Sequence, residues 1–158
     1  MVRILFVCWG NICRSPMCEF VMKDMVKKAG LAEHFLIESA ATSSEEIWNG
    51  VGNPVYPPAR EELAKHGLSC EGKRARKLVE GDYEAYDYLI GMEDMNLRYM
   101  RQILGGDPDH KLWKLLSFAG LERGIADPWY TGDFRSTYKD VELGCRALLE
   151  HILECGDR

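Results

Sequence analysis

The sequence Cys8-Trp9-Gly10-Asn11-Ile12-Cys13-Arg14-Ser15 directly follows an apolar run at residues 2–7. The apolar run has the length of a β-strand, and Arg14-Ser15-Pro16 opens a helical pattern in which Ser15 suits a cap and Pro16 suits the first turn. A loop between a strand and a helix points its backbone N–H groups and the positive end of the helix inward. The stretch therefore predicts a loop that wraps a phosphate dianion, with the Cys8 thiol at its base.

The same spacing of cysteine and arginine occurs a second time, at Cys70 and Arg76. The context differs, because Cys70 follows Lys65-His66-Gly67-Leu68, which is typical of a helix end. Arg76 is also followed by a lysine rather than by a hydroxyl residue. We interpret Cys70 as structural and the basic residues after it as a solvated surface cluster, since charge runs usually face water. That cluster comprises Lys73, Arg74, Arg76 and Lys77.

Length and composition indicate one globular domain spanning residues 1–158. The chain is 46% hydrophobic and 28% charged, and its size allows a core without disulfide or metal staples. A formal net charge of −5 argues against binding to nucleic acid or to an anionic membrane. The sequence has neither an apolar run of membrane-spanning length nor a signal-peptide pattern, so we expect a cytoplasmic protein.

The cysteines are spaced unlike those of a zinc site or of a secreted disulfide scaffold. They are Cys8, Cys13, Cys18, Cys70, Cys145 and Cys155. Because none of them forms a Cys-x2-Cys pair, we expect free thiols in a reducing cytosol. The sequence predicts neither a metal site nor a cofactor.

Apolar periodicity alternates between strand and helix along the chain. It predicts strands at 2–8, 35–41, 86–92 and 111–118, helices at 14–29, 59–65, 93–104 and 139–154, and long loops at 42–58 and 119–138. The short apolar run at 111–118 is also compatible with a helix. This alternation predicts an α/β three-layer sandwich, with a central four-stranded parallel sheet and helices on both faces. Sites in such sheets lie at the carboxyl ends of the strands, where Cys8 is placed.

The residue types in the first loop fit phosphoryl transfer by a covalent route. A helix N-terminus, inward N–H groups and a nearby arginine favour the thiolate form of a cysteine. The planar guanidinium of Arg14 can bind two phosphate oxygens at once. Gly10 permits close approach of the backbone, and Ser15 can donate to the sulfur as it leaves. The chain is therefore predicted to be a cysteine-dependent phosphatase, the alternative being that Cys8 is a buried strand-end thiol.

Two Asp-Pro pairs are candidates for the acid that protonates the leaving group. Asp107 lies in the polar stretch Gly-Gly-Asp-Pro-Asp-His, and we interpret it as a turn former. Asp127 precedes Pro128-Trp129-Tyr130 in a long loop. An aspartate beside two aromatic rings can protonate a phenolic oxygen while the rings flank the substrate ring. Asp127 is thus the candidate general acid, with a turn-forming role as the open alternative.

Taken together, these motifs resemble the low-molecular-weight protein tyrosine phosphatases, and the resemblance covers essentially the whole chain. It is most specific at residues 7–16 and in Asp127-Pro128-Trp129-Tyr130. Further matches follow in the family's order, namely Ser39-Ala40-Ala41-Thr42, Trp48, His66-Gly67 and Met92-Glu93-Asp94-Met95-Asn96.

The resemblance implies hydrolysis of phosphotyrosine in protein substrates, without a cofactor, through a cysteinyl-phosphate. It implies Cys8 as nucleophile, Arg14 as phosphate binder, and Asp127 as general acid and then general base. It also implies that Asn11, Ser39 and His66 form a hydrogen-bonded support for the loop. The substrate-binding residues implied in this way are Trp9, Gly10, Asn11, Ile12, Cys13, Ser15, Trp48, Trp129 and Tyr130. Without the resemblance, core packing is the simpler account of the aromatic residues.

The resemblance further suggests that Cys8 and Cys13 can pair as a disulfide after oxidation of Cys8, the alternative being that Cys13 is a packing residue. The chain also departs from the family pattern. Asn49 follows Trp48 where histidine is common, the loop at 43–58 is longer, and Glu93 stands where aspartate is frequent. These departures concern the choice of substrate more than the chemistry.

Three other functions share part of this pattern. A thiol-dependent arsenate reductase has a similar fold but needs a further pair of nearby cysteines, whereas Cys70 stands alone. A protein-arginine phosphatase resembles this loop with threonine where this chain has Ile12. A non-enzymatic phosphate-binding module would not require Cys8, Ser15 and Asp127 together. We therefore expect a tyrosine phosphatase, acting as a monomer or weak dimer.

Overall fold

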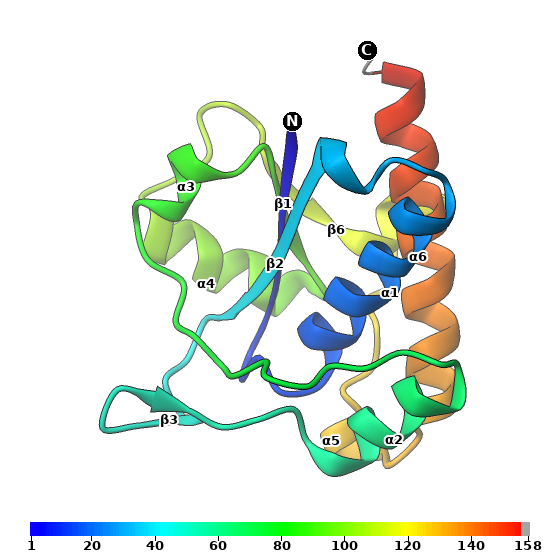
Figure 1. The fold of residues 1–158 in the computed structure, drawn as a ribbon. Coiled ribbons are helices and arrows are strands. Elements are labelled where there is room, and N and C mark those ends of the chain that lie inside the picture. The colour runs from blue at the N-terminus through cyan, green and yellow to red at the C-terminus, as the bar shows by residue number, and fades with distance from the viewer. Residues whose placement is uncertain (156–158) are drawn as a thin grey trace.

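The central sheet has four parallel strands in the order β2-β1-β5-β6. The computed structural model describes residues 1–155. The strands are β1 (Val2–Cys8), β2 (Phe35–Ala41), β5 (Tyr88–Gly91) and β6 (Leu112–Lys114). β1 lies inside the sheet, with β2 on one side and β5 on the other (Figure 1). The predicted four-stranded parallel sheet is confirmed.

Helices cover both faces of the sheet, as the alternation of elements predicts (Figure 1). The α-helices are α1 (Arg14–Lys28), α2 (Pro57–Lys65), α3 (Asp82–Ala85), α4 (Asp94–Leu104), α5 (Pro128–Thr131) and α6 (Phe134–Cys155). Short 3₁₀ turns lie at η1 (Ala32–His34) and η2 (Leu115–Ala119). One face carries α1 and α6, and the other carries α4, so the molecule is a three-layer sandwich.

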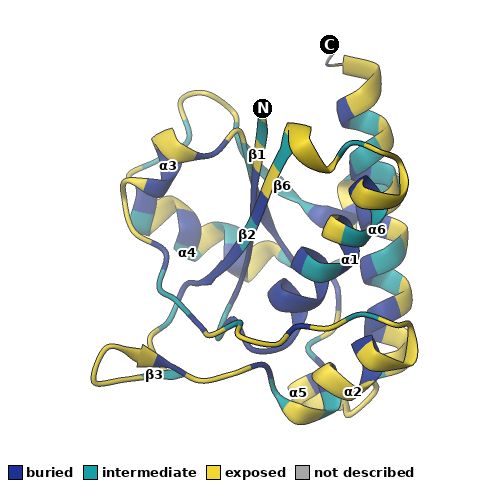
Figure 2. Cartoon of the chain, viewed as in Figure 1, coloured by how far each residue is buried: buried dark blue, intermediate teal, exposed yellow. Residues whose placement is uncertain are grey.

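The strand β1 contributes residues to both hydrophobic cores, one on each face of the sheet. Its residues Ile4 and Phe6 belong to the core under α1 and α6, whereas Leu5 and Val7 belong to the core under α4. All four are fully buried, and the larger part of β1 is dark blue in the burial view (Figure 2). A strand covered on both faces has to be apolar at consecutive positions, which explains the uninterrupted apolar run at 4–7.

The region predicted as a loop at 42–58 contains more structure than expected. A hairpin joins β3 (Ile47–Trp48) to β4 (Val51–Gly52), and α2 begins at Pro57. Asn49 and Gly50 form its turn with φ angles of 51° and 78°. This pair is a strong hairpin signal, because asparagine and glycine tolerate the left-handed conformation that the turn requires. The β3–β4 hairpin protrudes at the lower left of Figure 1, at the end of the molecule where β1 ends.

Two further boundaries differ from the prediction. The segment 111–118 is a strand only as far as Lys114, after which a 3₁₀ turn brings Leu115 against Gly144 of α6. The last helix begins at Phe134, five residues before the predicted start. Its beginning is set by Asp133, whose carboxylate accepts hydrogen bonds from the backbone N–H and the hydroxyl of Ser136 at 2.9 and 2.7 Å. These bonds lower the pKa of Asp133.

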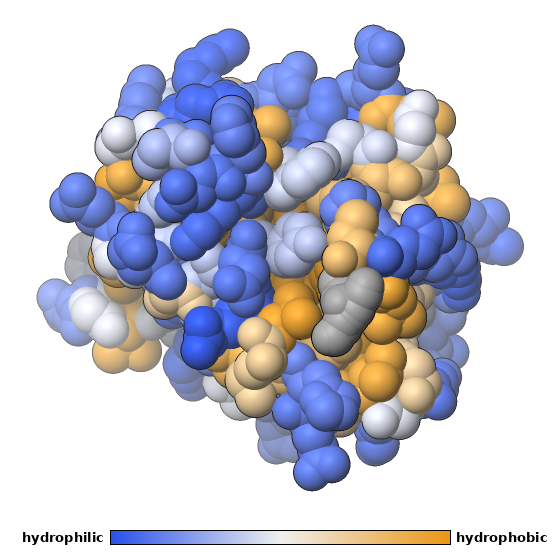
Figure 3. Space-filling view, turned by 90° about the horizontal axis from the view of Figure 1, so that it is seen from above, coloured by the Kyte–Doolittle hydropathy of each residue, from blue (hydrophilic) through white to orange (hydrophobic). Residues whose placement is uncertain are grey.

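The connections place a crevice at the carboxyl ends of β1 and β5. The chain leaves β1 into α1 on one face and leaves β5 toward α4 on the other, which makes this a topological switch point. The opposite end of the molecule, where the strands begin, is largely hydrophilic around its border, with apolar residues exposed between (Figure 3). Within residues 1–155, no helix is long and apolar enough to cross a membrane.

Candidate active site

The segment between β1 and α1 closes around the sulfur of Cys8. The backbone N–H of Asn11 donates to Cys8 Sγ at 3.3 Å, and Ser15 Oγ lies 3.0 Å from the same sulfur. Asn11 has a φ of 61°, a left-handed conformation that asparagine tolerates better than most residues. Cys8 is only 3% exposed, at the carboxyl end of β1. The backbone of Asn11 and the hydroxyl of Ser15 therefore both face the sulfur of Cys8.

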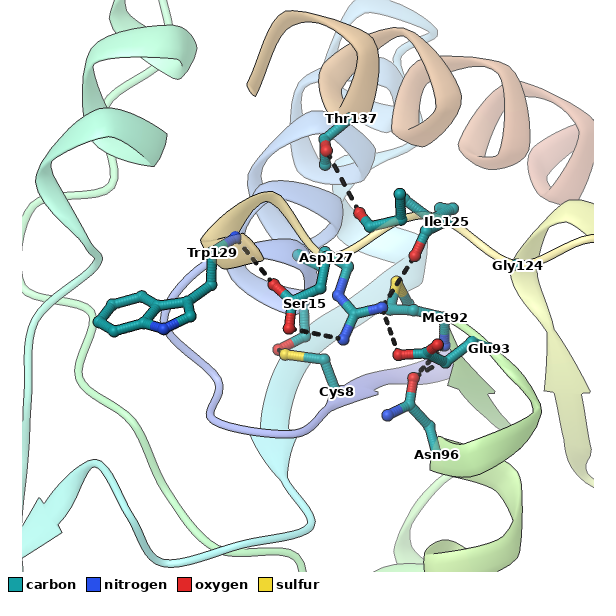
Figure 4. A network of polar contacts seen from close by, with 12 residues as sticks. Cys8, Ser15, Met92, Glu93, Asn96, Gly124, Ile125, Asp127, Trp129 and Thr137 are labelled. Carbon is teal, nitrogen blue, oxygen red and sulfur yellow. Dashed lines mark hydrogen bonds and ion pairs between the residues drawn. The ribbon is translucent and has the colours of Figure 1, made fainter. Parts of the chain in front are cut away.

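Arg14 is the first residue of α1, and its guanidinium is held from three directions (Figure 4). One amino group donates to Glu93 Oε2 at 2.7 Å and to the carbonyl of Ile125 at 2.8 Å, and the other lies 3.4 Å from Asp127 Oδ2. The side chain is 2% exposed. Burial acts to lower the pKa of Arg14, but the charges of Cys8 and Asp127 and the bond to Glu93 outweigh it and raise the pKa. The guanidinium is thus a fixed cation beside the thiol.

Asp127 reaches the site from a loop 113 residues away from Arg14 in sequence. The backbone N–H of Ile125 donates to the carbonyl of Met92, which docks this loop at the end of β5. Asp127 is also the N-cap of α5, since its Oδ1 accepts from the N–H of Trp129 at 3.0 Å. The other oxygen faces Arg14 (Figure 4). The turn-forming role and the place beside the thiol therefore coexist in one residue.

Asp107 has the structural role that its sequence predicts. Its carboxylate accepts hydrogen bonds from the hydroxyl of Tyr83 and from the N–H groups of Lys111 and Leu112. These bonds hold the turn before β6, and Asp107 is not among the residues that line the cavity around Cys8. The structure thus separates the two Asp-Pro pairs.

A cavity of about 480 Å³ opens above the phosphate loop. Most of the predicted site residues line it, namely Cys8, Trp9, Gly10, Asn11, Ile12, Cys13, Arg14, Asp127, Trp129 and Tyr130. Ser15 is not in the lining, but its hydroxyl contacts the sulfur of Cys8, which is. Sequence reasoning missed four further lining residues, which are Glu45, Glu46, Met95 and Tyr99, and gave Glu93 no role. Tyr99 packs edge-on against Trp9, with ring centroids 5.6 Å apart.

Trp48 is not part of the cavity lining, so its predicted place in the cleft is wrong. Its side chain is 79% exposed, and its residue pairs with Val51 across the β3–β4 hairpin. The hairpin turn carries Trp48 outward, and Glu45 and Glu46 line the cavity from the segment just before it. A hairpin in place of the predicted loop is the reason for the difference.

Asn11 and Ser39 meet beneath the loop. The side-chain amide of Asn11 donates to Ser15 Oγ at 2.8 Å and to Ser39 Oγ at 3.0 Å. Its carbonyl oxygen accepts from the backbone N–H of Arg76 at 3.1 Å. The amide therefore connects the phosphate loop to β2 and to the segment that follows α2.

The prediction that His66 belongs to this support is wrong. His66 ends α2, where its Nε2 lies 3.1 Å from Glu62 Oε2 and its ring stacks on Tyr138 at 3.7 Å. These contacts hold the ring between α2 and α6, whereas Ser39 is the hydroxyl that Asn11 reaches on β2. Neither Asn11 nor Ser39 has a hydrogen bond to His66 among the described residues.

Glu19 and Lys73 supply the support instead. Ser39 Oγ donates to Glu19 Oε1 at 2.6 Å, and Lys73 Nζ lies 3.2 Å from that oxygen and 3.0 Å from the carbonyl of Ser39. Lys73 is therefore not a solvated surface residue as predicted. Burial lowers the pKa of Lys73, and the neighbouring Glu19 partly offsets this. The sequence gave no local signal for this pair, because its members lie on α1 and in a distant loop.

The rest of the predicted surface cluster is also tied into the fold. Arg74 donates to the carbonyl of Gly52, and Arg76 pairs with Asp82 at 3.1 Å and donates to Tyr86. Desolvation acts against the charge of Arg76, but its bonds to Asp82 and Tyr86 raise its pKa. Lys73 and Arg76 are thus structural, whereas Arg74 is exposed apart from its bond to Gly52 and Lys77 has no ion pair among the described residues. Within the described residues, no group of three or more His, Cys, Asp or Glu side chains is arranged to hold a metal ion.

Comparison with known proteins identifies the family. Residues 3–156 match the family described as "Low molecular weight phosphotyrosine protein phosphatase". A relative from Bacillus subtilis, the low molecular weight protein-tyrosine-phosphatase YfkJ, is 34% identical over 154 residues, which is 96% of each chain. PtpA of Staphylococcus epidermidis, described in the same words, is 32% identical over 98% of this chain and 96% of its own.

Solved structures agree with the sequence matches. The crystal structure of YfkJ superposes with a TM-score of 0.92 over 99% of this chain and 98% of the other, at 33% identity. A Drosophila arginine phosphatase superposes with a TM-score of 0.83 over 98% and 99% of the two chains, at 29% identity. The chain therefore belongs to the low molecular weight protein-tyrosine-phosphatase family, whose members hydrolyse phosphotyrosine with a cysteine nucleophile.

Proposed function

We propose that Cys8, Arg14 and Asp127 together carry out the phosphatase reaction through a cysteinyl-phosphate. The observation that supports this most strongly is their convergence on one cavity, with the sulfur of Cys8 facing the N–H of Asn11 and the charge of Arg14. Each of the three comes from a different part of the sequence or fold, at the end of β1, the start of α1 and the cap of α5.

In the first step the Cys8 thiolate attacks phosphorus in line with the leaving phenolic oxygen. The S–P bond forms as the P–O bond breaks, and Asp127 gives its proton to the departing oxygen. Arg14 and the loop N–H groups bind the three equatorial oxygens, whose charge is spread in the transition state. Glu93 and the carbonyl of Ile125 hold the guanidinium in its plane, so that little reorganisation is needed during the reaction.

In the second step water attacks the phosphocysteine. Asp127, now a carboxylate, takes a proton from the water, and the S–P bond breaks to return the thiolate and release phosphate. Ser15, 3.0 Å from the sulfur, donates a hydrogen bond to the departing thiolate. Ser15 therefore contributes mainly to this second step.

Substrate binding follows from the lining of the cavity. The loop residues Gly10, Asn11, Ile12 and Cys13 surround the phosphate with their backbone. The rings of Trp9, Trp129 and Tyr130 flank the phenyl ring, and Trp129 is itself supported by Tyr56, with ring centroids 4.7 Å apart. A phenyl ring with its phosphate at the base of the cavity is the ligand that this arrangement suits.

The proposal extends to the setting of the enzyme. Its substrates are phosphotyrosine-containing proteins, and it acts in the cytoplasm as a monomer or weak dimer without a cofactor. The six thiols, all within the described residues and all free, are consistent with a reducing compartment. The positive charge that metal-dependent phosphatases take from an ion is supplied here by Arg14.

Hydrolysis of matched phosphopeptides tests the substrate class. Peptides that carry phosphotyrosine, phosphoserine or phosphoarginine in one sequence should release phosphate fastest from phosphotyrosine, by about 10²-fold or more, because only its aromatic leaving group fills the cavity. Activity should persist in the presence of a chelator. Faster release from phosphoarginine would instead assign the chain to the activity of its Drosophila relative.

A further inference from the structure

Two acidic residues line the active-site cavity without serving the reaction. Glu45 and Glu46 lie on the segment between β2 and β3, and both face the cavity that holds Cys8. Neither contacts Cys8, Arg14 or Asp127 among the hydrogen bonds and ion pairs of the described residues. Their charge therefore needs another explanation.

The segment that carries these residues is fixed to the phosphate loop. The N–H groups of Thr42 and Ser43 donate to the carbonyls of Cys8 and Trp9 at 2.9 and 3.0 Å. The hydroxyl of Ser43 donates to the same Trp9 carbonyl at 2.9 Å. Glu45 and Glu46 follow after Ser44, so main-chain hydrogen bonds next to them fix their distance from the phosphate loop.

Glu46 packs on the phosphate loop itself. A side-chain carbon on Gly10 would lie 3.2 Å from Glu46 Cγ, so the absence of a side chain at Gly10 leaves room for Glu46. The carboxylate accepts a hydrogen bond from the amide of Asn53 at 2.8 Å, which holds it without neutralising it. Its charge is felt in the loop, because it adds to the pKa increase of Cys13 that burial and the charge of Cys8 chiefly cause.

The charges of the cavity do not balance. Its acidic lining residues are Glu45, Glu46, Glu93 and Asp127, and its basic lining residue is Arg14. Arg14 is already paired with Glu93 and Asp127. Glu45 and Glu46 have no ion pair with any cation among residues 1–155. The phosphate end of the cavity is therefore matched to an anion, while the side beside the β3–β4 hairpin is matched to a cation.

We propose that Glu45 and Glu46 form a specificity subsite for a lysine or arginine side chain that lies close to the phosphotyrosine in a protein substrate. This rests on the proposed function. A basic neighbour offsets the repulsion between these carboxylates and the incoming phosphate dianion, and it gains two charge pairs at the mouth. An acidic neighbour meets the same carboxylates and is disfavoured.

Three kinds of phosphotyrosine peptide test the proposal, with two lysines, two alanines or two glutamates next to the phosphotyrosine. Each kind is made twice, once with the pair before the phosphotyrosine and once with the pair after it. At low ionic strength the wild-type kcat/KM should be about tenfold higher for the lysine peptide than for the glutamate peptide, as expected for two exposed charge pairs. The ratio should fall toward one in Glu45→Gln/Glu46→Gln, and also in wild type at about 0.5 M salt.

Two further variants make the result specific. Glu45→Lys/Glu46→Lys should reverse the order and favour the glutamate peptide, an outcome that a misfolded protein cannot produce. Glu61→Gln/Glu71→Gln, which removes two exposed charges outside the cavity, should keep the wild-type ratio. Equal hydrolysis of all three kinds of peptide by wild type, or an unchanged ratio in the glutamine variant, would overturn the subsite. Failure of wild type to hydrolyse any of them would instead refute the proposed function.

Discussion

Two segments of this chain share the spacing of a cysteine and an arginine six residues apart, yet only one of them lines the cavity. The segment from Cys8 curls between a strand and a helix, and both its cysteine and its arginine reach the cavity. The segment from Cys70 turns at Glu71-Gly72 and then forms isolated bridges to Pro54 and Ala41 through Arg74 and Lys77. Cys70 is buried in the core, where burial raises its pKa, and Arg76 pairs with Asp82.

The second segment nevertheless serves the first. The N–H of Arg76 donates to the amide of Asn11, and Lys73 reaches Ser39 and Glu19 beneath the loop. Ala75 packs in one cluster with Ile12 and Cys13. The comparison shows that a spacing acquires its meaning from the elements that flank it. Between a strand end and a helix start the spacing makes a binding loop, whereas without those flanking elements it makes a support.

Replacing Arg14 or Arg76 by lysine should give the largest difference in activity between the two segments. Arg14→Lys should lower kcat for an aryl phosphate by about 10³-fold, because a point charge cannot bind two equatorial oxygens as the planar guanidinium does. Arg76→Lys should stay within about threefold of wild type and lose mainly stability, since its bidentate contact with Asp82 is structural. Steady-state kinetics and thermal unfolding of both variants check this, and similar kinetic losses in both would remove the distinction.

The aspartate that faces each arginine gives the next contrast. Asp127→Asn should slow hydrolysis of phosphates with poor leaving groups by about 10²–10³-fold, and of nitrophenyl phosphate much less, because the need for a proton grows with the basicity of the leaving oxygen. Asp82→Asn should change all substrates alike. The measurement is a series of aryl phosphates of increasing phenol basicity. A uniform loss in Asp127→Asn would contradict its role as general acid.

Lys73 tests whether the second segment supports the first. Lys73→Met should lower kcat about tenfold and weaken competitive inhibition by phosphate, because Glu19 loses a buried partner and Ser39 loses a bond to its carbonyl. Lys73→Arg keeps the positive charge and should restore part of kcat and part of the inhibition by phosphate. A role that depends only on side-chain volume would not predict this recovery. Lys77→Met is the matched control on the same run, and it should behave as wild type. Normal phosphate affinity in Lys73→Met would limit this residue to stability.

Cys13 should matter least for turnover and most for recovery from oxidation. Peroxide converts the Cys8 thiolate to a sulfenic acid, and attack by Cys13 then forms a disulfide and releases water. Burial and the charge of Cys8 raise the pKa of Cys13, and the second contribution is lost once Cys8 is oxidised. Cys13→Ser should keep kcat within about threefold but recover less activity after peroxide and dithiol treatment. Equal recovery in wild type and variant would exclude Cys13 as the resolving thiol.

Much of the fold could be predicted from the sequence, because local patterns determine it. The buried run before Cys8 and the alternation of elements were sufficient for the sheet and its layers. The predicted boundaries of elements were wrong where a short turn or cap signal competes with apolar periodicity. Asn49-Gly50 forms a hairpin turn, and Asp133 caps α6 earlier than its apolar stripe suggests. Such signals span about two to four residues, and the apolar periodicity of a longer window does not detect them.

The candidate site divides in the same way. The loop at 8–15 is contiguous, so its sequence places Cys8, Asn11, Arg14 and Ser15 together without knowledge of the fold. The contacts that hold it are distant in sequence, as between Arg14 and Glu93 or Glu19 and Lys73. No periodicity links such residues. The resemblance assigned the support of the loop to His66. In the structure His66 contacts Glu62 instead, and Lys73 contacts Ser39.

Parallel replacement of Cys8 and Cys70 tests the central claim most directly. Brief reaction with an aryl phosphate labelled on phosphorus, followed by acid quenching and peptide mapping, measures where phosphate becomes attached. The account predicts label on Cys8 in wild type and in Cys70→Ser, with kcat of the latter within about threefold of wild type because Cys70 only packs in the core. Cys8→Ser should bind phosphate but show neither label nor turnover. Label on Cys70, or turnover by Cys8→Ser, would contradict the account.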